Sequence, residues 1–314
     1  LVIGGGMAGT FAALAAKRAD PSRSVVIVEQ SNILGGQGTV GGVAGFVGDT
    51  ARVNAIFAEL VARLERAGKI DPYRSNDDRR AYDLESCGYY LQDMVAEAGI
   101  ETWLHAVALD GKAREGWVTE VLISVGPTLV VVEPGAVIDA TGNALMADIL
   151  GLPTRHLGAL AQLPMSLYFT LWDTGRPVRP FLPEGCPRWD SDDDLPMTSL
   201  HGFADGRIEV KMKVVGFDAA DGFSLSEAEI HGRRQMMGLI YHLQTRGYRG
   251  RHAAGGGKPL ATYTLASVSR AIGQREGRRI VGGATLTEDH VPHAAVFDDP
   301  VAVLRQADAV IFNR

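Results

Sequence analysis

The sequence predicts an α/β protein in which a Rossmann-like domain with an inserted β-meander is joined to a second, α+β domain. Three observations favour this fold class. A glycine-rich turn lies between an apolar strand and an alanine-rich helix at the start of the chain, strand-like segments with turn signals follow one another over residues 105–142, and the pattern changes after residue 153. A length of 314 residues is enough for roughly two domains.

The first strand, helix and strand are expected to form a βαβ unit. Residues 1–3 are typical of the end of a buried strand, and the alanine-rich residues 10–18 predict a helix that ends before Pro21. Residues 24–29 form a continuous apolar run, as parallel strands do when both faces of their sheet are covered.

The turn between the first strand and the helix fits the pattern G-x-G-x-x-G with Gly4, Gly6 and Gly9. In this pattern the first glycine permits a tight turn, the second lets the backbone approach a pyrophosphate, and the third lets the helix pack against the strand. Glu29 ends the second strand, where an acidic residue accepts hydrogen bonds from a ribose. The combination predicts a dinucleotide-binding domain rather than a tight turn without a ligand.

A second glycine-rich loop, residues 34–46, directly follows this unit. A simple NAD-binding domain would continue with regular βα units, whereas here a flexible backbone lies where a larger ligand could extend past its pyrophosphate. The alternative is a mobile surface loop, and the apolar residues interleaved among the glycines favour a buried, ligand-lining segment.

The rest of the first domain contains two expected helices, residues 51–67 and 83–98, and then the meander. The dipeptides Asp110–Gly111, Gly126–Pro127 and Pro134–Gly135 are interpreted as its turns. A last apolar strand, residues 136–140, runs into the sequence ATG.

The pattern after residue 153 predicts a substrate domain. Residues 163–172 and 207–216 read as strands, and residues 224–247 as a helix with Ser224 or Ser226 as its N-cap. The acidic run 190–194 lacks the glycine and glutamate of a calcium loop and is interpreted as a solvated loop. The expected division is residues 1–153 for the first part of the cofactor domain, 154–250 for the substrate domain, and 251–314 for a return to the cofactor domain that is incomplete at its C-terminus.

The composition is that of an average globular protein. Hydrophobic residues make up 46% of the chain, charged residues make up 22%, and the formal net charge is -6. Such a chain offers no basic surface for nucleic acid, and no apolar run reaches the roughly 20 residues that span a bilayer. Cys87 and Cys186 lack the spacing of a zinc site or a disulfide framework. We expect a soluble, cytoplasmic protein with no metal and no nucleic-acid partner. Because the chain begins inside a strand, a targeting segment upstream of residue 1 is compatible with the sequence.

Several motifs in order resemble one known family. The glycine fingerprint, Glu29, LGGQGT, AGIETWLHAVAL, VIDATGNALMADILG and IGQREGRRIVGGATLTEDHV resemble the FAD-dependent oxidoreductases of the glutathione-reductase type. Within them the chain is similar to a bacterial group that is distantly similar to fumarate reductase flavoproteins. The sequence GGQGTVGG contains no cysteine, so thiol–disulfide chemistry is not expected.

The resemblance implies that the cofactor is FAD and that it lies along the glycine-rich segments. Glu29 would contact the adenosine ribose, the adjacent Gln30 would belong to the cofactor site, and Val107 would meet the adenine through its backbone. The resemblance implies three further sets of contacts. The pyrophosphate would be contacted by Gly4, Gly6, Met7, Ala8 and Gly9. The ribityl and pyrophosphate region would be lined by Gly35, Gly36, Gln37, Gly38 and Thr39, and the cofactor would be closed over by Ala140, Thr141 and Gly142.

Arginines in the late block are candidate catalytic residues. Arg275, Arg278 and Arg279 have helical spacing, and paired guanidinium groups suit a substrate carboxylate or the negative charge of a reduced flavin. The alternative is a network of ion pairs with Glu276, Glu288 and Asp289.

Two histidines follow this block. His290 or His293 could take a hydroxyl proton from the substrate as hydride leaves the carbon, because the histidine pKa lies near neutrality. Either could equally be a loop histidine. Metal binding together with Asp289 is disfavoured because Pro292 interrupts the helix that would hold such a pair.

The leading functional hypothesis is an FAD-dependent oxidoreductase that transfers a hydride between a small polar organic substrate and flavin N5. The sequence does not identify the electron acceptor, and it is compatible with a homo-oligomer. One alternative is an FAD-dependent monooxygenase that uses NAD(P)H and oxygen. The other is a non-redox flavin-binding subunit.

Overall fold

The computed structural model describes residues 1–47, 54–73, 76–250 and 252–282. Its first layer is a parallel sheet in the order β10-β1-β2-β6. All four strands are short, β1 and β2 are entirely apolar, and the alanine-rich helix α1 links β1 to β2, so the βαβ unit is confirmed. The elements are β1 (Val2–Ile3), α1 (Met7–Ala19), β2 (Val26–Val28), β6 (Glu101–Trp103) and β10 (Ile138–Asp139).

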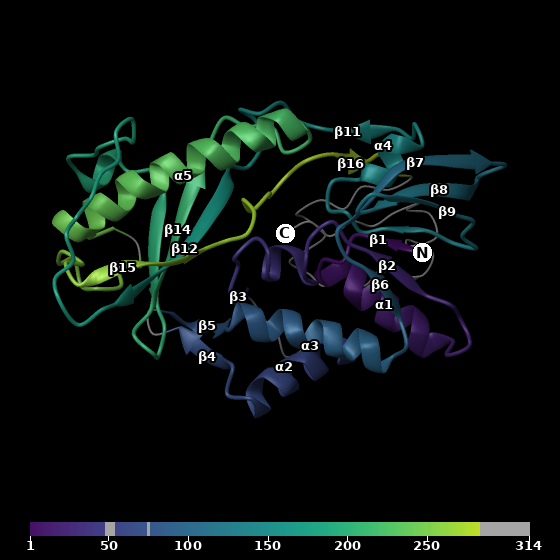
Figure 1. Ribbon diagram of the computed structural model, residues 1–314, viewed down its shortest axis with the longest axis horizontal. Coiled ribbons are helices and arrows are strands. Elements are labelled where there is room, and N and C mark those ends of the chain that lie inside the picture. Colours follow the sequence, from purple (N-terminus) through teal and green to yellow (C-terminus); the bar gives the residue numbers. More distant parts are fainter. Residues whose placement is uncertain (48–53, 74–75, 251, 283–314) are drawn as a thin grey trace, which may run out of the picture.

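Both faces of the parallel sheet are covered, by helices on one side and by an antiparallel sheet on the other (Figure 1). The helical face packs Leu14 and Ile27 against Leu60 and Leu91, and the opposite face packs Ile3 against Val121. The covering elements are α2 (Ala55–Arg66), α3 (Leu84–Glu97), β7 (Ala106–Arg114), β8 (Trp117–Val125) and β9 (Thr128–Val132). Double coverage explains the continuous apolar pattern of β2.

The predicted meander is confirmed as β7-β8-β9, but one of its turns is in a different place. Asp110 and Gly111 lie inside β7, where the register shifts at a β-bulge, and the hairpin turns instead at Glu115 and Gly116, both with positive φ. A glycine within a strand marks a bulge as readily as a turn, which is why the dipeptide was misassigned. Gly126 and Pro127 do form the second turn.

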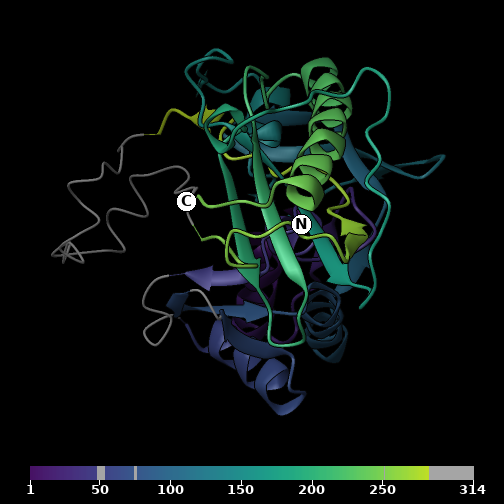
Figure 2. The same cartoon turned by 90° about the vertical axis from the view of Figure 1, so that its left-hand side faces the viewer.

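A second sheet, in the order β13-β14-β12-β15, lies beside the first unit and carries α5 on one face (Figure 2). Alternate residues of its strands, among them Leu167, Phe169 and Val210, form a separate core with Leu239 of α5. The elements are β12 (Met165–Asp173), β13 (Thr198–Gly202), β14 (Ile208–Val214), α5 (Gly222–Thr245) and β15 (Tyr263–Val268). Because β15 pairs with β12, this sheet extends past the boundary expected at residue 250.

Helix α5 begins earlier than predicted. Its N-cap is Asp221, whose carboxylate accepts hydrogen bonds from the amides of Phe223 and Ser224, so neither Ser224 nor Ser226 is the cap. The Ser224 hydroxyl instead accepts a hydrogen bond from the Asp218 amide. Helix α2 is capped by Asn54, and the part of its predicted range that covers residues 51–53 lies outside the described residues.

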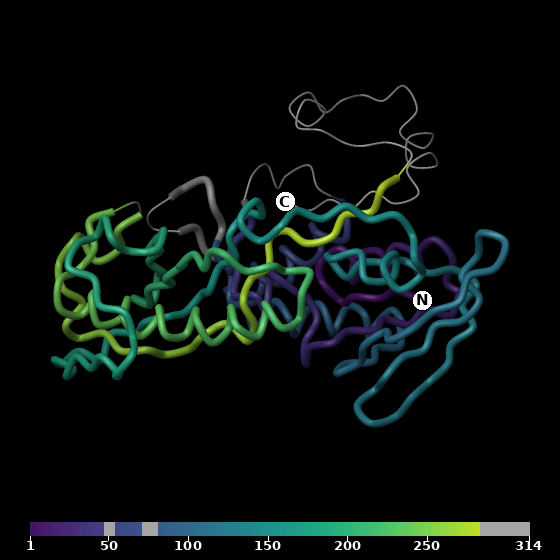
Figure 3. The backbone as a smooth tube through the Cα atoms, turned by 90° about the horizontal axis from the view of Figure 1, so that it is seen from above, coloured from purple at the N-terminus to yellow at the C-terminus, as the bar shows by residue number. Residues whose placement is uncertain are grey.

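The two sheets form the two ends of an elongated molecule, and the chain crosses between them more than once (Figure 3). After β15 the chain crosses back, and its strand β16 (Arg279–Ile280) pairs with β11 (Thr154–Arg155), the strand where the chain leaves the first unit. A small third sheet, β3-β5-β4, lies below the junction in Figure 1. The remaining elements are β3 (Gly45–Val47), β4 (Ile70–Tyr73), β5 (Asn76–Tyr82), α4 (Leu145–Ile149), β11 (Thr154–Arg155), β16 (Arg279–Ile280), η1 (Gly36–Gly38) and η2 (Asp192–Asp194). None of the helices described is long and apolar enough to cross a membrane.

Candidate functional site

Two glycines of the fingerprint are required by the packing of the protein itself. Gly4 has φ +99°, and a Cβ there would lie 2.4 Å from the carbonyl oxygen of Ala140. A Cβ on Gly9 would lie 1.9 Å from the carbonyl oxygen of Gly4. Gly4 therefore allows the turn between β1 and α1 to lie against the end of β10, and Gly9 allows α1 to approach that turn, as the pattern predicts.

Gly6 is different, because nothing in the described protein requires a glycine there. Its backbone, at φ -62° and ψ 179°, is open to any residue. Among the described residues, the only heavy atom within 4 Å of a Cβ at this position would be the Gly36 Cα, at 3.9 Å. Gly6 also forms the N-cap of α1 without a side-chain hydrogen bond. The missing side chain leaves space beside the positive end of α1, next to Met7 and Ala8, where a phosphate group fits.

Glu29 is held rigidly at the carboxyl end of β2. Its side chain is buried, one carboxylate oxygen accepts a hydrogen bond of 2.7 Å from the Gly5 amide, and the other accepts one of 2.7 Å from the Ser31 amide. Each oxygen retains a further acceptor site, so ribose hydroxyls fit the same carboxylate. The Ala106 amide donates to the Glu29 carbonyl, which brings the next residue, Val107, close to this strand end; Gln30 is exposed.

The second glycine-rich loop lies directly against the first turn. The Gly35 amide donates to the Gly5 carbonyl, and Gly35 and Gly36 have positive φ. The Thr39 hydroxyl donates to the Leu34 carbonyl, so the threonine closes the loop on itself, while Gln37 is exposed and Gly38 is buried. The two glycine-rich segments therefore form one continuous surface.

The ATG segment closes the same end of the sheet. The Ala140 amide donates to the Ile3 carbonyl, and Gly142 has φ +74°. The sequence interpretation missed Asp139, whose carboxylate accepts hydrogen bonds from Thr141 and from the amides of Met146 and Ala147. An aspartate at a strand end before a short helix is the available signal.

The glycine-rich loop continues to the second sheet. The Ala271 amide donates to the Val40 carbonyl, and a Cβ on Gly42 would lie 2.7 Å from the Cβ of Tyr168. The face of the second sheet that meets this loop is the one opposite α5. It carries the polar residues of the alternating strands, so a ligand that followed the loop would reach a polar surface.

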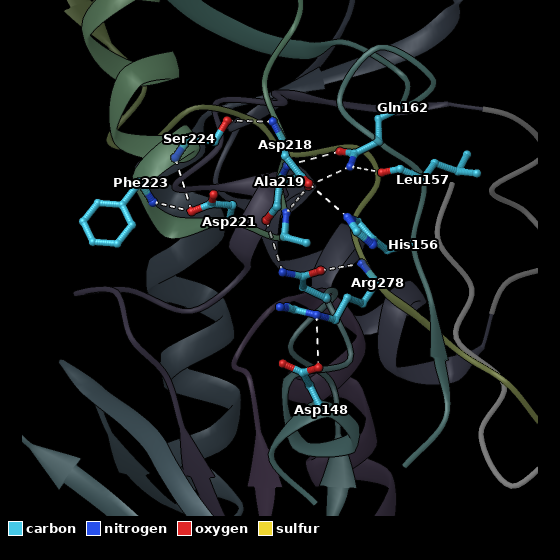
Figure 4. Close-up of polar contacts among 12 residues, drawn as sticks. Asp148, His156, Leu157, Gln162, Asp218, Ala219, Asp221, Phe223, Ser224 and Arg278 are labelled. Carbon is cyan, nitrogen blue, oxygen red and sulfur yellow. Dashed lines mark hydrogen bonds and ion pairs between the residues drawn. The ribbon is translucent and has the colours of Figure 1, made fainter. Parts of the chain in front are cut away.

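The late arginines do not lie on a helix, because residues 274–278 have no helical hydrogen bonds and lead into β16. Arg278 joins two parts of the chain: its amide donates to the Asn143 side chain at 2.6 Å, and its Nε lies 3.2 Å from Asp148 Oδ1 (Figure 4). Arg279 pairs with Glu276. Both arginines therefore form ion pairs, as in the alternative interpretation of this block as an ion-pair network. Glu276 was among the partners expected for that network, and Asp148 was not.

Arg275 is exposed, and its charge acts on Lys213 of β14. The other candidates of this region, His290, His293, Glu288 and Asp289, lie outside the described residues. Lys213 itself was missed by the sequence interpretation. The available signal was its place on the polar side of an alternating strand, IEVKMKV.

Comparisons with known proteins agree with this geometry. A family model described as FAD dependent oxidoreductase matches residues 1–306. No curated protein matches the chain.

Solved structures share the fold. The chain is similar to p-nitrophenol 4-monooxygenase PnpA from Pseudomonas putida DLL-E4, with 13% identity, a TM-score of 0.53, and coverage of 90% of this chain and 68% of that one. It is also similar to the myxobacterial chondrochloren halogenase CndH, with 15% identity, a TM-score of 0.51 and coverage of 89% and 62%. A third similar structure is OxyS anhydrotetracycline hydroxylase from Streptomyces rimosus, with 14% identity, a TM-score of 0.51, and coverage of 90% of this chain and 53% of that one. The chain thus spans about half to two thirds of these proteins.

Proposed function

The chain belongs to the family of FAD-dependent oxidoreductases, and on this premise we propose that it transfers a hydride between a small polar organic substrate and flavin N5. Residues 1–153 would supply most of the FAD site, and the second sheet would cover the substrate. The observation that carries the proposal is the continuous glycine-rich surface, which starts at Gly6 and ends against the polar face of the second sheet. When bound, FAD supplies two-electron redox chemistry.

Each part of this surface has a proposed role. Gly6 with the amides of Met7, Ala8 and Gly9 binds the pyrophosphate at the positive end of α1. Glu29 accepts hydrogen bonds from the adenosine ribose, and the Val107 backbone lies along the adenine. Residues 35–39 line the ribityl chain, and residues 140–142 close the site from the opposite side. The protein binds and orients the reactants and keeps water out, since these residues have no redox chemistry of their own.

A second candidate function is oxygenation with NAD(P)H and oxygen as co-substrates. It is favoured by the fold that this chain shares with a monooxygenase and a hydroxylase. At such low identity the likeness concerns the fold, so the hydride-transfer proposal stands first.

Three measurements on the full-length protein test these functions. Flavin absorbance bands that move to the supernatant after acid precipitation would support noncovalent FAD binding, and their absence after reconstitution with FAD would refute the proposal. Anaerobic bleaching of the bands by one member of a panel of alcohols, sugars and hydroxy acids supports hydride transfer. Substrate-dependent consumption of NADPH and oxygen, with no anaerobic bleaching by the panel, supports oxygenation instead.

Glu29→Gln is expected to weaken FAD binding about tenfold, or about 1.4 kcal/mol. The amide side chain lacks the charge and turns one acceptor into a donor. It also leaves the buried Gly5 or Ser31 amide without its partner, so we expect a loss of stability of about 1–2 kcal/mol. Titration of the apoprotein with FAD and a denaturant melt measure the two effects. The exposed Glu115→Gln serves as the control, and an unchanged affinity of Glu29→Gln would remove the ribose role.

A further inference from the structure

Lys213 is a buried lysine on the face of the second sheet that is turned away from α5. Its neighbours along β14, Met212 and Val214, belong to the core under α5, so Lys213 projects from the opposite face. Only 4% of its surface is exposed. Its ammonium donates a hydrogen bond of 2.8 Å to the hydroxyl of Ser166, the residue directly opposite on β12.

No carboxylate of the described residues lies within ion-pair distance of the Lys213 ammonium, whose hydrogen bond goes to a hydroxyl. The charged groups that act on it are cations, Lys211 from the same strand and Arg275 from the segment after β15. Burial, followed by these two positive charges, lowers the pKa of Lys213 to about 7. A lysine without an anionic partner is costly to bury, which makes a functional reason for its position worth testing.

The Lys213–Ser166 pair lies next to the end of the glycine-rich loop. Ser166 and Gly273 exchange two backbone hydrogen bonds, of 3.0 and 2.7 Å. A Cβ on Gly273 would lie 3.0 Å from Gln37 Oε1, so Gly273 separates Ser166 from the loop. If the dinucleotide extends from Glu29 past Gly6 and along residues 35–39, as the proposed function holds, its redox-active ring reaches this polar face.

We propose that Lys213, positioned by Ser166, faces the ring end of FAD and takes up one proton when FAD is reduced by two electrons. The inference rests on the proposed function. Reduction leaves negative charge on the ring, and a nearby amine then binds a proton more strongly. Lys213 would thus supply the missing counter-charge only in the reduced state, which explains a buried lysine without a carboxylate partner.

The same step indicates the substrate class, a compound with a hydroxyl on the carbon that loses hydride. The C–H bond breaks and its electron pair passes with the hydrogen to oxidised FAD, while the O–H bond breaks and its proton passes to the neutral Lys213 amine. A C=O double bond forms. The substrate is oxidised by two electrons, FAD is reduced by two, and Lys213 carries the proton.

The reduction potential of the FAD-loaded protein, measured against pH with reference dyes, tests proton uptake without a substrate. Each additional proton taken up changes the reduction equilibrium tenfold per pH unit, about 30 mV for a two-electron couple. From about pH 7 upward, the wild type is expected to show this additional slope. Lys213→Met should lose it. Lys213→Arg, permanently charged, should lose it as well but keep a higher potential than Lys213→Met.

Lys211→Met is the matched control, because it removes a lysine from the same face of the same strand. It should keep the additional slope, with the pH window moved upward because one repelling charge is gone. A variant Lys213→Met with bound FAD and the slope of the wild type would overturn the inference and leave the proposed function intact. A wild-type protein that binds no FAD would refute the proposed function itself.

The apoprotein provides a second readout, independent of FAD. The pKa of Lys213 is lowered from 10.5 to about 7 in the folded state, so between these values the unfolded chain binds more protons and stability rises with pH. Lys213→Met lacks this contribution. Its melting temperature relative to the wild type should be highest near pH 7 and should decrease toward pH 10. A difference that does not change with pH would show that Lys213 does not titrate in this range, against the inference.

Discussion

Gly6→Ala is expected to weaken FAD binding at least about 100-fold, or about 3 kcal/mol, while the apoprotein keeps its stability within about 0.5 kcal/mol. An alanine is allowed at φ -62° and ψ 179°, and its Cβ would meet only the Gly36 Cα, at 3.9 Å, among the described residues. The methyl group would instead occupy the space in which the pyrophosphate approaches the N-terminus of α1. Titration of the apoprotein with FAD and a denaturant melt of the same sample measure both quantities.

The control for this variant is Gly135→Ala, which adds a methyl group to an exposed glycine that has no neighbour within 4 Å in the part of the chain that the structure describes. Neither FAD affinity nor stability should change in the control. If Gly6→Ala bound FAD as tightly as the wild type, the pyrophosphate could not lie at this turn. The FAD site would then have to be sought elsewhere along the glycine-rich loop.

The parts of the fold that follow from local sequence were predicted well. The unit of β1, α1 and β2 depends on an apolar run, a helix of alanines and a few glycines with defined backbone requirements, and all of these can be read within 30 residues. The meander was also predicted, but its first turn was placed at Asp110 and Gly111 instead of Glu115 and Gly116, because a glycine in a β-bulge looks the same in sequence as a glycine in a turn.

Site residues could be predicted only where a single segment of sequence contains the whole pattern that identifies them. The polar residues of β14 indicated a face of a strand, but the burial of Lys213 depends on Ser166 and on segments around Gly273 that are distant in sequence. The spacing of the late arginines was interpreted as helical for a related reason. A spacing of three or four residues is helical only if the segment is a helix, and here pairing with β11 and contacts with Asn143 favour an extended chain.

Gly9→Ala is expected to have the opposite effect to Gly6→Ala: it should destabilise the apoprotein by about 3 kcal/mol or more, whether or not FAD is present. Its Cβ would lie 1.9 Å from the Gly4 carbonyl oxygen and 3.0 Å from the Ala140 Cβ. The nearer atom belongs to the backbone, and Gly4 is itself fixed at φ +99° against Ala140, so the clash moves α1 away from the sheet. A melt of the apoprotein should show a much lower midpoint.

The pair of variants separates packing from ligand binding within one six-residue motif. A domain has a net stability of about 5–15 kcal/mol, so Gly9→Ala should remain partly folded and be measurable, and FAD should raise its midpoint less than that of the wild type. If Gly9→Ala melted like the wild type and Gly6→Ala unfolded, the two glycines would have exchanged roles. The contact of α1 with the turn at Gly4 would then not be what requires a glycine at position 9.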